Sequence, residues 1–180
     1  MFHNTTSLIS RFSMSGVLTV RMREIDSGRI FRTIIKKNTI VNGASAVVLR
    51  LLLQETTDTS VTPASSLQLG SMRFGTSIVA TSPSDSNLTN EIVAVRKQLG
   101  DTEKTLVGTT MTLTATLDGA DAPGSVFSEV GLFTKGATWD GTISPTTNGL
   151  FMFARQVHAP ITKSTSFAFD YSWTIQISLN

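Results

Sequence analysis

The segment "FAFDYSWTIQISL" (167–179) alternates without interruption between large apolar side chains and smaller or polar ones. Because successive side chains of a β-strand point to opposite faces, this period of two predicts a long strand with one buried face. Trp173 lies at the centre of the apolar series and is predicted to be a buried structural residue. A strand with one apolar face must pack on a second layer, so the segment restricts the chain to layered β folds.

The same patterning recurs along the chain. "TMTLTATL" (110–117) alternates in the same way. "VLTVRMREI" is followed by the turn residues Asp-Ser-Gly and by "RIFRTII", which together predict a β-hairpin over 16–36. "GLFMFARQVH" (149–158) begins with a continuous apolar run, as expected of a strand covered on both faces.

One helix is predicted, from Asn42, a residue suited to a helix N-cap, to about Gln54. Roughly seven or eight antiparallel strands and this short helix fit best into two sheets packed face to face. We therefore predict an all-β fold, an antiparallel, jelly-roll-like β-sandwich with one short helix. A β-barrel is the alternative.

The first fifteen residues, "MFHNTTSLISRFSMS", sustain neither a helical nor a strand period. We predict that residues 1–15 form a flexible N-terminal arm and that residues 16–180 form a single β-sandwich domain. The arm holds several large apolar side chains and one charge, which makes it a candidate for ordering against a neighbouring subunit. The alternative is that it docks into the core of its own domain. The candidate interaction residues of the arm are Phe2, Leu8, Ile9, Arg11 and Phe12.

Charged residues make up only 16% of the chain, and a surface poor in charge favours burial against partner subunits. Residues 1–37 carry seven basic and two acidic side chains, whereas the remainder carries eight basic and eleven acidic ones. This asymmetry predicts either an acidic partner for the amino-terminal third or simply solvated strand faces. The net charge of +2 is too small to indicate nucleic acid. Neither a signal peptide nor a membrane-spanning segment is predicted.

No catalytic or metal-binding pattern stands out. The chain has no cysteine, and its two histidines, His3 and His158, are too few for a metal site. The acidic stretches 85–87 and 118–121 resemble pieces of calcium loops, but plain turns are favoured. Trp139, on a polar loop beside an aspartate, is a candidate platform for sugar. The alternatives are that it packs under its own loop or is buried against a neighbouring subunit. We predict no enzymatic activity and no cofactor.

Glu129 and Gly131 interrupt the apolar strand "VFSEVGLF" (126–133). With an unbroken period of two, both would share a strand face with Phe127 and Phe133. Gly131 would leave room for a neighbouring group, and Glu129 would accept a hydrogen bond or ion pair from an arginine such as Arg155. These residues are therefore interpreted as structural positions.

Four stretches occur in a distinctive order: "NTIVNGASAVVLRLLL", "LQLGSMRFGTSIVATSPSDSNLTNEI", "FSEVGLFTKG" and "GLFMFARQVHAPITKSTSFAFDYSWTIQI". Their order and spacing over residues 35–180 resemble a widespread group of virion proteins of tailed bacteriophages. Members share a helix before an apolar strand ending in Gly-x-Gly-Thr, an acid-Val/Ile-Gly-Leu-Phe strand, and a closing strand with Trp-x-Ile. This chain departs at "RFGTS", where the first glycine of Gly-x-Gly-Thr is missing.

The resemblance implies a structural part of a virion, assembled in the cytoplasm of the host bacterium. Because no fibre shaft follows the predicted domain, we expect a capsid decoration or cement protein that binds and stabilises the icosahedral head. The arm of residues 1–15 would then become ordered against a neighbouring subunit or the capsid shell. We expect a homotrimer whose partners are the major capsid protein or other virion proteins, without nucleic acid or membrane. The alternative is a tail, collar or baseplate module that attaches fibres or binds host glycan.

Overall fold

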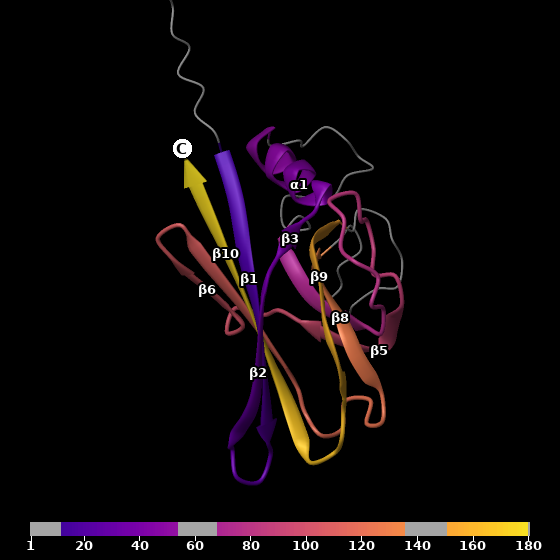
Figure 1. Cartoon of the computed structure of the whole chain (residues 1–180). Coiled ribbons are helices and arrows are strands. Elements are labelled where there is room, and N and C mark those ends of the chain that lie inside the picture. Colours follow the sequence, from indigo (N-terminus) through magenta and orange to yellow (C-terminus); the bar gives the residue numbers. More distant parts are fainter. Residues whose placement is uncertain (1–11, 54–67, 136–150, 180) are drawn as a thin grey trace, which may run out of the picture.

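A computed structural model of the chain describes residues 12–53, 68–135 and 151–179. It contains two antiparallel sheets packed face to face, so the predicted β-sandwich with one short helix is confirmed (Figure 1). Sheet A has the strand order β2-β1-β10-β7-β6 and sheet B the order β3-β9-β8-β4-β5.

The strands of sheet A are β1 (Phe12–Glu24), β2 (Ile30–Lys37), β6 (Lys104–Val107), β7 (Thr110–Leu117) and β10 (Phe167–Leu179). Those of sheet B are β3 (Thr39–Ile40), β4 (Leu69–Gly75), β5 (Glu91–Gln98), β8 (Val126–Thr134) and β9 (Met152–Thr162). The described residues thus form ten strands, more than the seven or eight expected. β3 and β6 are too short, and β5 too mixed in polarity, to show a sustained period.

Strands β1 and β10 form the longest ladder of the sandwich, with Phe12 opposite Leu179 at one end and Glu24 opposite Phe167 at the other. The predicted start of the domain at residue 16 is therefore wrong, because residues 12–15 of the expected arm belong to β1. The serines among these residues obscure the strand period, and pairing with β10 supplies what the local sequence does not. The remaining candidates of the arm, Phe2, Leu8, Ile9 and Arg11, lie outside the described residues.

The core lies between the two sheets. Trp173 is fully buried there, as predicted, and its strand neighbour Tyr171 packs edge-on against Phe74 of sheet B with ring centroids 4.8 Å apart. Burial raises the pKa of Tyr171. The two apolar faces therefore interlock through large aromatic side chains, which fixes how the sheets stack.

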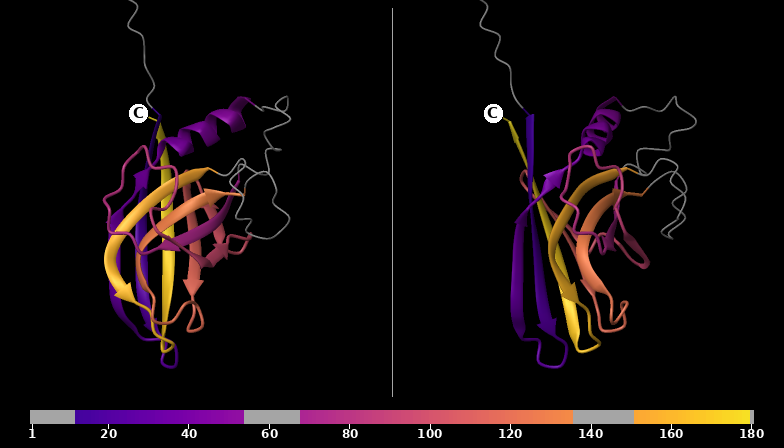
Figure 2. Two further views of the ribbon diagram at one scale, coloured as in Figure 1. Left: turned by 90° about the vertical axis from the view of Figure 1, so that its right-hand side faces the viewer. Right: turned by 45° about the vertical axis from the view of Figure 1, so that its right-hand side comes forward.

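The helix α1 (Asn42–Leu53) lies across one end of the sandwich (Figure 2). Ala44 and Val47 bury one side of its first two turns in the core. Gly43 permits this approach, because a β-carbon at that position would come 2.2 Å from the carbonyl oxygen of Met152 in β9. A glycine in the first turn thus lets the helix backbone rest directly on sheet B.

Candidate functional site

Arg155 lies at the centre of a buried polar cluster on the outer face of sheet B. Its side chain is only 1% exposed, and its Nε donates to Glu129 Oε1 at 2.7 Å. The ion pair expected between these two residues is therefore present. The other guanidinium nitrogens reach into the loop of residues 76–90, donating to Asp85 Oδ2 at 2.8 Å and to Thr89 Oγ1 at 2.9 Å. Burial lowers the pKa of Arg155, but hydrogen bonds to Asp85 and Glu129 outweigh it and raise the pKa.

Glu129 holds the other end of the same loop. Its carboxylate accepts the backbone N–H groups of Thr89 at 2.8 Å and Asn90 at 3.2 Å. Gly75, opposite Glu129 on β4, makes room for this carboxylate, since a β-carbon there would come 2.4 Å from Oε2. Gly75 is the glycine of the "RFGTS" stretch, so the chain needs its glycine there for space beside a buried acid.

The expected face of Glu129 needs one correction. Phe127 belongs to the main core between the sheets, whereas Phe133 packs with Leu88 on the outer face of sheet B. The ladder between β8 and β9 shifts register between Phe127 and Glu129, and this irregularity breaks the period of two. Gly131 does leave room for neighbours, because a β-carbon there would come within 3.0 Å of both Phe133 and Leu88.

The polar cluster is closed and suits a structural role. Arg155 also donates to the carbonyl oxygens of Val79, at 3.2 Å, and Ala80, at 3.4 Å, so its donors are directed to fixed protein groups. Each of the three charged side chains, Arg155, Glu129 and Asp85, is paired with another member of the cluster. The cluster holds the loop of residues 76–90 against sheet B. On the surface of this loop, Ile78 is 71% exposed and Val79 is 59% exposed.

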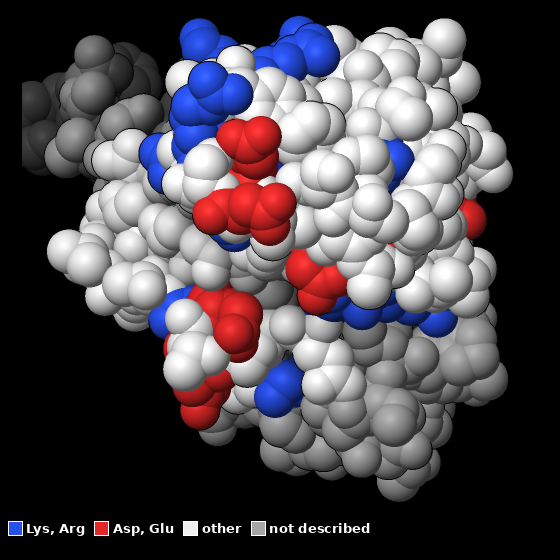
Figure 3. All heavy atoms as spheres, turned by 90° about the horizontal axis from the view of Figure 1, so that it is seen from below, with Lys and Arg blue, Asp and Glu red and all other residues white. Residues whose placement is uncertain are grey.

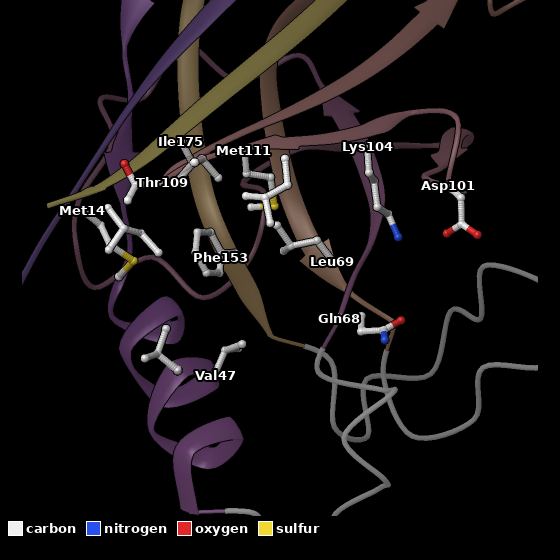
Figure 4. A pocket seen from close by; sticks show the side chains of 14 residues that line it. Met14, Val47, Gln68, Leu69, Asp101, Lys104, Thr109, Met111, Phe153 and Ile175 are labelled. Atoms are coloured by element: carbon white, nitrogen blue, oxygen red, sulfur yellow. The ribbon is translucent and has the colours of Figure 1, made fainter.

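A large apolar pocket opens at the end of the sandwich that α1 covers (Figure 4). It has a volume of about 660 Å³ and is bounded by both sheets and the helix. The apolar walls come from Met14 and Ile175 of sheet A, Leu69 and Phe153 of sheet B, and Val47 of α1. A cavity of this size and lining accepts apolar groups.

The polar groups of this pocket lie at its rim. Asp101 and Lys104 flank a turn in which the Lys104 N–H donates to the Asp101 carbonyl oxygen at 3.4 Å. Partial burial, with the nearby charge of Lys135, lowers the pKa of Lys104. Among the described lining residues the carboxylate of Asp101 is single and the walls are mostly apolar, which suits a binding surface.

The remaining titratable candidates have structural partners. His158 is buried, its Nδ1 lies 2.8 Å from the Ala159 carbonyl oxygen, and burial lowers its pKa. In the acidic stretch 118–121, Asp118 and Asp121 accept backbone N–H groups of their own turn, and Asp121 pairs with Lys97 at 2.7 Å. Over the part of the chain that the structure describes, no three His, Asp or Glu side chains gather as metal ligands would.

Two residues considered in the sequence are not described by the structure. Trp139 and His3 lie outside the described residues, so the suggested sugar platform has no described geometry. Among the described helices none is long and apolar enough to cross a membrane. Reasoning from sequence missed Gly75, Asp85 and Thr89. In the sequence alone, nothing indicates that Gly75 makes room for Glu129 or that Asp85 accepts a hydrogen bond from Arg155.

Comparison with protein families, curated proteins and solved structures finds no match for this chain.

Proposed function

We propose that the chain is a structural protein of a tailed-bacteriophage particle, a decoration or cement protein that binds the outside of the head as a homotrimer. The observation that carries the proposal is the exposure of large apolar side chains on separate projecting segments. Leu106 and Val107, at the β6–β7 hairpin, are 73% and 71% exposed. Ile78 and Val79 are exposed on the loop of residues 76–90, which the Arg155 cluster holds against sheet B. Clustered apolar side chains at a surface favour contacts with neighbouring proteins.

The sequence resemblance adds to this support. The stretches that carry it form α1, β4, β8, β9 and β10, and they include Glu129, Gly131 and Arg155. They therefore correspond to the helix, to most of sheet B with the loop of residues 76–90, and to the long strand at the centre of sheet A. A rigid frame that presents several contact patches suits a protein whose task is repeated weak binding over a shell, where multivalency supplies the affinity.

Counting copies in purified particles tests the proposal. Absolute quantification by mass spectrometry, with the major capsid protein as the internal standard, is expected to give hundreds of copies per particle. A few to a few dozen copies would instead favour the tail, collar or baseplate module. Absence from purified particles would contradict both assignments.

Self-association provides a second measurement. Size-exclusion chromatography with light scattering is expected to show a trimer of the 19.4 kDa chain at micromolar concentration. The double variant Leu106→Ser/Val107→Ser should weaken self-association if this hairpin lies in the subunit interface. A monomer at all concentrations up to the millimolar range would exclude the trimer.

A further inference from the structure

Strand β2 is an open edge of sheet A. Within the part of the chain that the structure describes, it pairs with β1 alone, at the outer end of the strand order. Seven of its eight residues are exposed, and only Ile34 is half-buried. Such an edge offers unpaired backbone groups to another strand, and natural proteins usually cover or interrupt it.

The ladder tells which backbone groups of β2 face outward. The N–H of Asn38 donates to the Gly16 carbonyl oxygen at 2.8 Å, just beyond the paired Val17 and Lys37. Because residues of an antiparallel strand alternate in the direction of their backbone groups, those of Thr33, Ile35 and Lys37 point away from β1. These three residues are therefore ready to pair with an added strand.

A groove lies beside this edge, between β2 and β9. Its volume is about 350 Å³, and its lining includes Phe31, Arg32, Pro160, Ile161, Phe167 and Phe169. On the β9 side, β3 pairs only with Ala154 and Arg155, so the rest of β9 has no partner strand there within the described chain. The sandwich is thus open along this side, with space for side chains from a strand laid along β2.

The charges on β2 are uniformly positive. Arg32 and Lys36 stand opposite the buried Met22 and Leu18, so they share with Ile34 the face of β2 that looks toward the groove. None of the ion pairs formed within the described residues involves Arg32, Lys36 or Lys37. On the end of the molecule seen from below, acidic side chains lie beside basic ones (Figure 3).

We propose that β2 is a docking strand that takes an extended acidic segment of a partner protein as an added strand of sheet A. The spacing of Arg32, Ile34 and Lys36 on one face specifies the pattern acid-x-apolar-x-acid in that segment. Backbone pairing with Thr33, Ile35 and Lys37 gives affinity, and the two carboxylates give selectivity.

A second copy of β2 does not fit this edge. Antiparallel pairing about the centre of the strand would bring Arg32 of each copy close to the lysines of the other. Like charges in directly opposed positions destabilise a strand pair, and lysines on an edge strand are a common device against self-pairing. The same cations that oppose a second copy attract an acidic segment.

Fluorescence anisotropy with labelled peptides tests the proposal on the purified full chain. The probes are STETVTETS and its charge-reversed form STKTVTKTS. The acidic peptide is expected to bind at least tenfold more tightly, with affinity that falls as salt is raised. Equal binding of the two peptides would overturn the proposal.

Charge reversal on the protein sharpens the test. The double variant Arg32→Glu/Lys36→Glu should invert the preference, so that the basic peptide binds more tightly. The matched control, Arg21→Glu/Arg29→Glu, changes the net charge equally at exposed positions outside β2 and should keep the original preference. If both double variants behaved alike, only the net charge would matter and the docking strand would be excluded.

Hydrogen exchange measured by NMR reports strand addition itself. The amides of Thr33, Ile35 and Lys37 should exchange rapidly in the free protein and slowly with the acidic peptide bound. Unchanged exchange on binding, or protection already present in the free protein through self-pairing, would contradict the proposal. These measurements use no virion, so their failure leaves the copy-number test of the proposed function standing, and the reverse also holds.

Discussion

The Arg155 cluster, on the outer face of sheet B, and the β2 edge of sheet A each contain an arginine, but the two charges have opposite surroundings. Arg155 is 1% exposed and contacts two carboxylates, a hydroxyl group and two backbone carbonyl oxygens. Arg32 belongs to a strand that is exposed along most of its length and has no acidic partner within the described residues. The charges of the first region are paired within the subunit, whereas we propose that those of the second are paired by a partner.

The difference follows from solvation. A buried guanidinium that lacked partners would cost several kcal/mol, so the chain must supply them from its own loop. An exposed guanidinium is solvated by water and needs no partner for stability. Its charge can therefore determine which partner binds. The three predictions below test whether Arg155 stabilises the fold while the cations of β2 do not.

The largest expected effect is that of Arg155→Met. Removing the cation leaves Glu129 buried without its partner and releases Asp85 and the carbonyl oxygens of the loop. We expect the free energy of unfolding to fall by about 3–5 kcal/mol, as for other broken buried ion pairs. Urea denaturation followed by tryptophan fluorescence measures it.

The double variant Arg155→Met/Glu129→Met is the control for this prediction. It removes both buried charges, so it should be more stable than Arg155→Met alone, although the loop N–H groups still lose an acceptor. A loss below about 1 kcal/mol for Arg155→Met would be typical of a surface pair and would remove the contrast between the two regions.

His158 is expected to give an intermediate effect that depends on pH. Burial lowers its pKa in the folded state, and the positive charges of Arg32 and Lys36 lower it further. Above the unfolded-state pKa of about 6.5 the imidazole is neutral in both states and contributes no pH dependence. Below the unfolded-state pKa of about 6.5 the unfolded chain takes up a proton that the folded chain does not. The free energy of unfolding therefore decreases as the pH is lowered, by at most about 1.4 kcal/mol per pH unit, until the folded-state pKa is reached.

The His158→Gln variant isolates this contribution. Urea denaturation of both proteins between pH 7 and 5 should show a steeper loss of stability for the wild type, because carboxylates contribute equally to both. Identical slopes would mean that His158 titrates normally in the folded protein.

The smallest effect on stability is expected for Arg32→Gln/Lys36→Gln. Both side chains are exposed and lack ion-pair partners among the described residues, so the free energy of unfolding should change by no more than about 0.5 kcal/mol. The pKa of His158 should rise, because two nearby positive charges are removed. NMR titration of the imidazole measures this shift. A large loss of stability would show that the β2 cations stabilise the fold, as Arg155 does.

Features that depend on local pattern were predictable from the sequence. The alternation of residues 167–179 gave β10 its length and placed Trp173 in the core, and the helix starts at the predicted residue. The Glu129–Arg155 pair was also predictable, because a buried acid in an apolar strand requires a cation and Arg155 lies on the next apolar strand.

Features that depend on strand register or on loops distant in the sequence could not be predicted from the sequence. The irregularity that separates Phe127 from Glu129 arises from how β8 aligns with β9, and no residue of β8 alone specifies it. Asp85 reaches Arg155 across 70 positions of sequence. The groove beside β2 exists because β3 covers only two residues of β9, which is a property of topology.

The pairing of β1 with β10 determines how the subunit bears mechanical load. Phe12 and Leu179 lie opposite each other at one end of the ladder, so tension applied between these two residues acts across the strands. Hydrogen bonds perpendicular to the strands then break in succession, as in a zipper, and each carries the whole force in turn. A pull along β2, by contrast, would shear its ladder with β1 and load all of its hydrogen bonds together. The subunit should therefore resist far more force when it is pulled along β2 than when Phe12 and Leu179 are pulled apart.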